Sequence, residues 1–223
     1  MKKIIILFVI VFSNLHIYSQ SQFGVILETN SANIKSADLY GVENGGLGYG
    51  FGISALSPFW WHSADFLTEM KFNTKKVKIA GYYDYYNQKT ELPDSEFSIS
   101  DINLDLVLNQ YIIMPEGNKL HLGVQGGFGI PLLNSWSTKN QKEDNFFDET
   151  RFINLNYIVG ISGGTEQLRA TIRYNKNISN IFNDFEVREP DPTNSHADLD
   201  SRLFNGKLSY ISLSVTYYLD NFK

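Results

Sequence analysis

The sequence predicts an all-β fold, a single antiparallel transmembrane β-barrel of about eight strands, and three observations predict it. Segments of about ten residues alternate between large apolar residues and polar or glycine residues. The polar faces carry charged side chains, which suit a barrel lumen better than a dry core. The links between the segments alternate between short and long, as periplasmic turns and extracellular loops do in outer-membrane barrels.

The N-terminus has the order of a secretion signal. Two lysines precede an apolar run from Ile4 to Phe12, and a more polar stretch follows. This run is roughly half of the ~20 residues that a membrane-spanning helix needs, which disfavours an anchor. Residues 1–20 are therefore predicted to be a signal peptide, and residues 21–223 the outer-membrane β-barrel domain.

Composition limits what the mature chain can be. It has no cysteine, which excludes disulfides and cysteine-bound metals. The full chain has a formal charge of −5, and removal of Lys2 and Lys3 leaves 17 Lys and Arg against 24 Asp and Glu, a charge of −7, which offers no basic surface for nucleic acid. No apolar run of ~18 residues follows the signal, which excludes a helical membrane protein. A mean hydropathy of −0.21 fits a barrel, because only alternate residues of each strand face lipid.

Eight segments of period two follow one another along the chain. They cover residues 23–28, 47–55, 64–73, 101–109, 120–130, 153–162, 168–175 and 210–219. The second is the clearest, because large apolar residues from Leu47 to Ala55 alternate with Gly48, Gly50 and Gly52. In each segment the apolar residues are predicted to face lipid and the others the lumen.

The links sort into two sets. Those near 58–62, 115–118 and 163–167 have about four to six residues, and those across 30–45, 74–98, 132–151 and 177–206 roughly 16 to 30. The short set is predicted to be periplasmic, because both termini of an even-stranded barrel lie there. Five of the six prolines fall in links and Pro131 closes a strand, so none interrupts a ladder of hydrogen bonds.

Aromatic residues near the ends of segments predict interfacial girdles. Trp60 and Trp61 lie beside a short link, and Tyr111, Tyr174 and Tyr217 lie near other segment ends. Aromatic rings are enriched where a membrane meets water. The alternative is that these rings belong to an ordinary core.

Four stretches of the sequence resemble the PorT-like outer-membrane β-barrel family. They are INLDLVLNQYI (Ile102–Ile112), LHLGVQGGFGI (Leu120–Ile130), NYIVGISGG…LRATIRYNKNISNIF (Asn156–Phe182) and KLSYISLSVTYYL (Lys207–Leu219). The resemblance covers most of the mature chain. It implies an outer-membrane barrel in the envelope of a Gram-negative cell and no catalytic residues. Some members of the family are linked to protein secretion.

Charged residues on the polar faces predict a network inside the barrel. The parity of a residue, meaning its place in the alternation of its segment, predicts which face it occupies. This parity predicts that five charged residues face the lumen: Asp65, Glu69, Asp105, Arg169 and Arg173. The third and seventh strands of eight lie opposite each other across a narrow space, where charges need partners. Arg173 is therefore predicted to pair with Glu69 or Asp105 at mid-depth, and Arg169 with Asp65 nearer the periplasm. The alternative is that water solvates each group separately.

The sequence predicts no catalytic, cofactor or metal site. His62, His121 and His196 share no metal-ligand spacing, and no serine has a G-x-S-x-G context. The glycine pairs lack a phosphate-loop context. The acidic stretch from Asp184 to Asp200 lacks the pattern of a calcium loop.

Two functions remain open. The first is a structural or interaction component of the envelope, which presents surface loops to partners, alone or in a secretion or transport assembly. The second is an outer-membrane enzyme, or a barrel that binds lipid or a small ligand, using His121 or a loop residue. The first is favoured because no converging set of acid–base groups is visible. Eight strands leave little room for a wide pore. The predicted partners are outer-membrane lipid and other envelope proteins.

Overall fold

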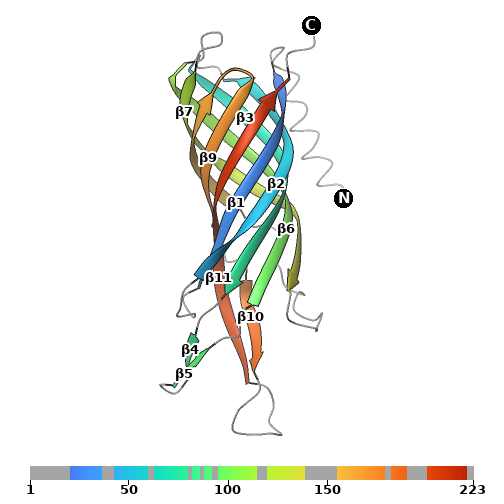
Figure 1. Cartoon of the computed structure of the whole chain (residues 1–223), viewed down its shortest axis with the longest axis vertical. Helices are drawn as coiled ribbons and strands as arrows, with labels where there is room; N and C mark the ends of the chain where they lie inside the picture. Colours follow the sequence, from blue (N-terminus) through green and yellow to red (C-terminus); the bar gives the residue numbers. More distant parts are fainter. Residues whose placement is uncertain are drawn as a thin grey trace.

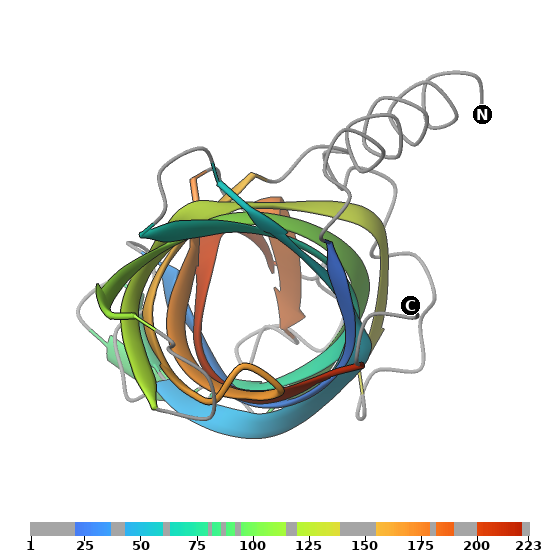
Figure 2. The ribbon, with the colours of Figure 1, turned by 90° about the horizontal axis from the view of Figure 1, so that it is seen from above.

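The computed structural model is a closed barrel of eight long antiparallel strands (Figures 1 and 2). It describes residues 21–36, 43–59, 63–79, 82–85, 88–91, 95–114, 120–138, 155–178, 182–189 and 200–219. The barrel strands are β1 (Gln22–Ser36), β2 (Glu43–Pro58), β3 (Ala64–Ile79), β6 (Ser95–Ile113), β7 (His121–Thr138), β8 (Asn156–Gly164), β9 (Leu168–Asn177) and β11 (Asp200–Tyr218). The predicted signal peptide lies outside the described residues.

Each barrel strand pairs with its neighbours in chain order, and β1 pairs with β11 to close the sheet. The closing register runs from Gly24 opposite Tyr218 to Ser36 opposite Gly206. Seen along its axis, the sheet forms a complete ring (Figure 2). The predicted fold class is therefore confirmed. No helix among the described residues is long and apolar enough to cross a membrane.

The barrel is inside-out relative to a water-soluble protein. On β9, the outward side chains of Leu168 and Ile172 are 50% and 49% exposed, while the inward side chains of Arg169 and Arg173 are buried. Other strands expose apolar side chains in the same way: Val25, Phe51, Val124, Val159 and Val215. Apolar surface costs roughly 25 cal/mol per Å² in water, so this outer wall suits lipid.

The two ends of the barrel differ in their connections. The short turns from β2 to β3, β6 to β7 and β8 to β9 lie at the end where β1 begins and β11 stops (Figure 1). Just before the last of these turns Gly164, the final residue of β8, has a φ of 151°, a conformation that favours glycine. The longer connections lie at the other end, which agrees with the predicted division of the links.

At the long-loop end the strands run further than the alternation predicts. The links predicted across 30–45, 74–98, 132–151 and 177–206 each contain strand residues. Three further strands lie there: β4 (Tyr82–Tyr85), β5 (Gln88–Glu91) and β10 (Phe182–Glu189). β4 pairs with β5, and β10 pairs with the start of β11. Alternation marks only the part of a strand with one face in lipid, so it misses strand residues beyond that band.

Pro131 is a second correction, because it lies inside β7 rather than at the end of a strand. The pairing of β7 with β8 stops at Gly129 opposite Asn156. Beyond that pair β7 keeps only β6 as a described neighbour, with a register shift between Ile102 and Asn103. Proline is tolerated on such an edge because its missing N–H breaks no ladder hydrogen bond.

Candidate functional site

The inner face of β2 is almost bare of side chains at mid-barrel. Gly48, Gly50 and Gly52 are the inward residues there. A Cβ atom at Gly50 would lie 2.0 Å from the side-chain oxygen of Asn73 on β3. A larger residue would have to displace that side chain. The glycines of β2 therefore leave space in which side chains from β1 and β3 meet.

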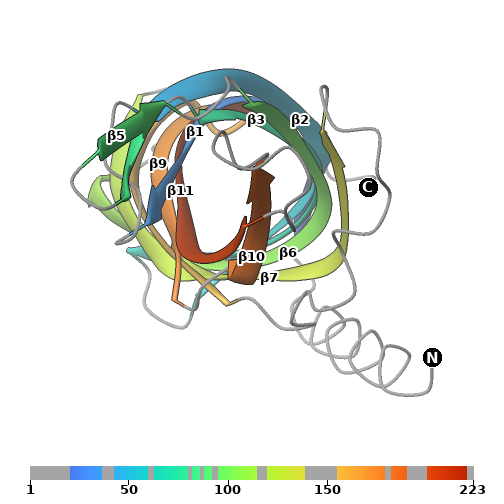
Figure 3. The ribbon, with the colours of Figure 1, turned by 90° about the horizontal axis from the view of Figure 1, so that it is seen from below.

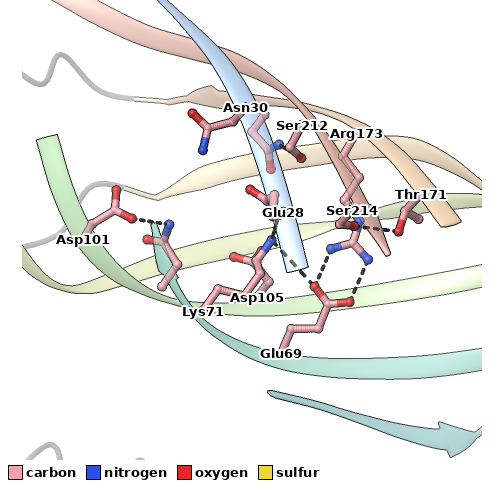
Figure 4. Close-up of polar contacts among 12 residues, drawn as sticks. Glu28, Asn30, Glu69, Lys71, Asp101, Asp105, Thr171, Arg173, Ser212 and Ser214 are labelled. Carbon is pink, nitrogen blue, oxygen red and sulfur yellow. Dashed lines mark hydrogen bonds and ion pairs between the residues drawn. The ribbon is translucent and has the colours of Figure 1, made fainter. Parts of the chain in front are cut away.

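A buried lysine occupies this space and holds three strands together (Figure 4). The Nζ atom of Lys71 on β3 lies 2.8 Å from Oε2 of Glu28 on β1 and 2.8 Å from Oδ2 of Asp105 on β6. It also lies 3.7 Å from Oε2 of Glu69. The side chains of all four residues are buried. Lys71 is therefore the hub of a cluster of three carboxylates.

An arginine from the opposite wall completes this central cluster. Arg173 on β9 donates two hydrogen bonds to Glu69, one of them from Nη2 to Oε1 at 2.8 Å. Its Nε donates to Oε1 of Gln125 on β7 at 2.7 Å. A Cβ atom at Gly160 on β8 would lie 2.9 Å from Cγ of Arg173, so this glycine also makes room. The bidentate pair crosses the lumen from β9 to β3 (Figure 4).

A second ion pair lies nearer the long-loop end. Lys75 on β3 pairs with Asp101 on β6, which also accepts a hydrogen bond from Nδ2 of Asn103 at 2.9 Å. The Nζ atom of Lys75 lies 4.4 Å from the centre of the Tyr210 ring. The cation is thus held between a carboxylate and an aromatic face, which compensate part of the cost of burying its charge.

A third group lies at the short-turn end. Nη2 of Arg169 lies 3.2 Å from Oδ2 of Asp65 and donates to the Tyr111 hydroxyl at 2.6 Å. That hydroxyl in turn donates to Asp65. The guanidinium carbon lies 5.5 Å from the centre of the Tyr218 ring. The ring of His121 stands edge-on to the Tyr111 ring, with ring centres 5.4 Å apart.

Two apolar clusters inside the lumen separate and cover these charges. One contains Leu56, Leu67, Val107, Ile158 and Tyr218, and the other Ala32, Ile34, Val77, Ile99, Leu208 and Tyr210. Along β3 the inward residues run from Asp65 through Leu67 to Glu69 and Lys71, and on to Val77. The central cluster therefore lies between two apolar layers, where electrostatic interactions are stronger than in water.

The predicted network residues meet in the structure, with additions. Arg173 lies with Glu69, and Arg169 with Asp65, while Asp105 pairs with Lys71. The prediction did not include Glu28, Lys71, Lys75 or Asp101. All but Lys75 lie within the predicted segments on their polar faces, so parity alone could have found them. Lys75 lies just beyond its predicted segment.

The predicted aromatic girdle needs one correction. Tyr111 faces the lumen, because its hydroxyl contacts Asp65 and Arg169. Tyr174 and Tyr217 point outward and are 36% and 51% exposed. Trp60 and Trp61 lie outside the described residues. Tyr111 has the parity of Asp105 and therefore faces the lumen, although it lies near the end of its strand.

No family model and no curated protein matches this chain, so the resemblance to PorT-like barrels stays a prediction. Among solved structures the chain is similar to Neisserial surface protein A (NspA), with 14% identity over 89% of this chain and 99% of that chain and a TM-score of 0.46. It is also similar to the outer membrane protein OprG from Pseudomonas aeruginosa, with 9% identity over 91% of this chain and 97% of that chain and a TM-score of 0.48. A third similar structure is Ail, the attachment invasion locus protein of Yersinia pestis, with 11% identity over 90% of this chain and 99% of that chain and a TM-score of 0.35.

These likenesses do not assign a function to this chain. The fold itself is established by the strand pairing and by the exposure of apolar side chains on the outer wall. Antiparallel strands closed into a ring, with polar residues inside and apolar residues outside, define one architecture. The chain has the fold of an outer-membrane β-barrel.

Proposed function

We propose that this chain is a sealed outer-membrane barrel that serves as a structural or interaction component of the cell envelope. In this role the barrel anchors the protein in the membrane, and its long-loop end binds partner proteins outside the membrane. The observation that carries the proposal is the bidentate pair of Arg173 and Glu69, which crosses the lumen between opposite walls.

The location is supported by the outer wall. The outward residues of β11 from Ile211 to Tyr217, and Leu219 just after the strand, are all apolar or aromatic and at least 43% exposed. Eight residue steps at ~3.3 Å, tilted by ~40°, span roughly 20 Å, close to the ~25 Å apolar band of outer-membrane barrels. The short periplasmic turns and the predicted signal peptide fit export to that membrane.

The closed lumen argues against a conducting role. The central ion pairs join β1, β3, β6 and β9, and their charged side chains are buried. Apolar layers lie on both sides of them. Moving a solute through would require breaking buried ion pairs, and removing one partner of such a pair costs about 3–5 kcal/mol.

The long-loop end carries the parts of the chain that reach beyond the ring. The β4–β5 hairpin and the ribbon of β10 with the start of β11 project there, as Figures 1 and 3 show. Backbone projecting from a rigid scaffold is a common place for binding. The resemblance to PorT-like barrels suggests that the partner belongs to a secretion assembly, and this finer part of the proposal rests on the resemblance alone.

Two measurements test the proposal. In planar bilayers the purified barrel is expected to give no unitary conductance, and steady conductance steps would contradict the sealed lumen. In whole cells, crosslinking is expected to capture envelope proteins. A variant in which a short turn replaces residues 182–205, which include β10, should lose a captured protein. A second variant, in which a short turn replaces residues 80–94 with the β4–β5 hairpin, is the matched comparison and shows which of the two projecting parts binds that protein. If both variants keep every crosslink of the wild type, the projecting strands are not the interaction surface.

A further inference from the structure

We infer that the outer wall of the barrel carries a docking surface for the phosphate group of an outer-leaflet lipid, formed by Lys176 on β9 and Lys207 on β11. This lysine surface lies at the long-loop end of the wall, on the side that faces the membrane. The inference requires only the outer-membrane location. It is therefore independent of the sealed lumen and of the partner proteins in the proposed function.

The charges on the outer wall are all of one sign. Among the outward side chains that the structure describes on the barrel strands, the charged ones are Lys76, Lys176 and Lys207, all at the long-loop end. The chain as a whole has the opposite bias, with 19 Lys and Arg against 24 Asp and Glu. The acidic side chains described on these strands face the lumen instead, as Glu28 and Asp105 do. A wall that carries only cations is complementary to anions in the surrounding membrane.

The strand register places two of these lysines beside each other. On β11 the Cα atom of Ser209 lies opposite that of Lys176, and Lys207 is the next outward residue of β11. Such diagonal neighbours are roughly 7–8 Å apart, within reach of long side chains. Lys207 is exposed and Lys176 is half-buried. On its other side, the Cα atom of Lys207 lies opposite that of Lys35. Three lysines therefore occupy the adjacent strands β9, β11 and β1 (Figure 1).

Neighbouring lysines on one face of a sheet need an anion. Like charges at directly opposite positions are destabilising, and Lys35 and Lys207 occupy such positions. No Asp or Glu is among the outward side chains that the structure describes on β1, β9 and β11. A lysine ammonium group has three donors and no acceptor, and phosphate is a common partner for it. A phosphate between Lys176 and Lys207 would supply the missing negative charge.

The height of the lysines on the wall identifies the source of the phosphate. Tyr174 and Ile211 lie opposite each other, are 36% and 57% exposed, and belong to the apolar band. Lys176 lies two residues beyond Tyr174, and Lys207 four residues beyond Ile211. At ~3.3 Å per residue and a tilt of ~40°, these steps rise roughly 5 and 10 Å. The headgroup layer on each side of a bilayer is roughly 5–8 Å thick. The lysines therefore lie at the level of lipid phosphates.

Two tyrosines beside the lysine surface support the same level. The Cα atom of Tyr157 on β8 lies opposite that of Lys176, and its ring centre lies 6.2 Å from that of Tyr174. Tyrosine is enriched where a membrane meets water, because its ring is apolar and its hydroxyl is polar. The rings and the ammonium groups thus match the acyl chains and the phosphate of one lipid.

The test uses the mature protein refolded in uncharged dodecyl maltoside micelles and native mass spectrometry. Diphosphoryl lipid A and the same lipid without its phosphates are titrated in parallel. We expect the wild type to retain diphosphoryl lipid A and to release the dephosphorylated lipid. Lys176→Gln combined with Lys207→Gln should weaken the apparent Kd roughly tenfold or more, because each lysine near an anionic headgroup contributes to binding. Replacing both lysines by arginine, which keeps the charge, should preserve binding.

Lys76→Gln is the matched control for Lys207→Gln, because it removes the same charge from another part of the outer wall, on β3. It should leave the apparent Kd almost unchanged. Migration on gels before and after boiling verifies that each variant is folded, and the comparison of the two lipids in the wild type needs no variant. Equal retention of the two lipids, or an effect of Lys76→Gln as large as that of Lys207→Gln, would overturn the inference.

Discussion

Arg173 on β9 and Glu69 on β3 face each other across the lumen and are joined by two hydrogen bonds. Both side chains are almost completely buried. A buried ion pair of this kind contributes little net stability when intact, but the loss of one partner leaves an uncompensated charge. This asymmetry gives the first prediction.

Arg173→Met should destabilise the barrel by about 3–5 kcal/mol, because Glu69 loses its main partner. The double variant Arg173→Met with Glu69→Leu should recover most of that loss. Unfolding in urea of the refolded protein in micelles measures both free energies. Equal destabilisation of the single and double variants would show that packing of the Arg173 side chain, and not its charge, is what matters.

Gly50→Val should prevent formation of the barrel. A Cβ atom at this position would lie 2.0 Å from Oδ1 of Asn73, inside the space through which Lys71 reaches Glu28. Overpacking of this kind costs at least about 1–3 kcal/mol. Gly126→Val is the matched control, because Gly126 has nothing within 4 Å of its Cβ position. Migration on gels before and after boiling reports the folded fraction, and equal behaviour of the two variants would contradict the prediction.

Leu213→Arg should reduce assembly in the membrane. Leu213 lies in the middle of the outward apolar residues of β11 and is 49% exposed. An arginine facing the bilayer midplane costs ~2–4 kcal/mol. Asn33→Arg, at an exposed position on the polar part of β1, should be tolerated. The amount of heat-modifiable barrel in the outer-membrane fraction measures the effect, and similar amounts for both variants would argue against a lipid-facing β11.

Tyr111→Phe should cost roughly 1–3 kcal/mol, because the hydroxyl links Arg169 and Asp65 inside the lumen and its loss leaves buried groups without a partner. Tyr217→Phe removes the same hydroxyl from an outward ring and should change stability little. Urea unfolding of the two variants gives the comparison. A girdle role for Tyr111 would instead make the two substitutions equivalent.

Single cysteines should report the orientation, since the chain has none of its own. Asn33→Cys lies at the long-loop end and Glu166→Cys in the short turn between β8 and β9, both at exposed positions. A membrane-impermeant maleimide added to intact cells should label Asn33→Cys only. Labelling of Glu166→Cys alone would mean that the barrel is inserted the other way round.

The alternation of residues was enough to predict the strand number, the lipid-facing residues and the meeting of Arg173 with Glu69. Each of these depends only on which face a residue occupies and on which strands lie opposite each other. The same rule places Tyr111 inside, so the girdle prediction for Tyr111 was wrong because it followed the place of the residue near a strand end instead of its parity. The prediction was therefore most accurate where it depended on parity alone.

Other features depend on distances that the sequence does not contain. Lys71 lies on the polar face of its segment, but its reach to Glu28 depends on the bare surface of β2 between them. Strand residues beyond the lipid band carry no alternation, so the projecting ribbon of β10 and β11 was predicted as loop.

The ion pair across the lumen also limits how many strands the sheet can have. In a flat sheet four strand spacings would separate β3 from β9, roughly 20 Å, too far for Arg173 to reach Glu69. The two residues lie 104 positions apart in the chain and meet only when the sheet has curled to the right circumference. A ring with one more hairpin would pull them apart. The pair therefore favours the eight-stranded ring over misassembled rings of other sizes.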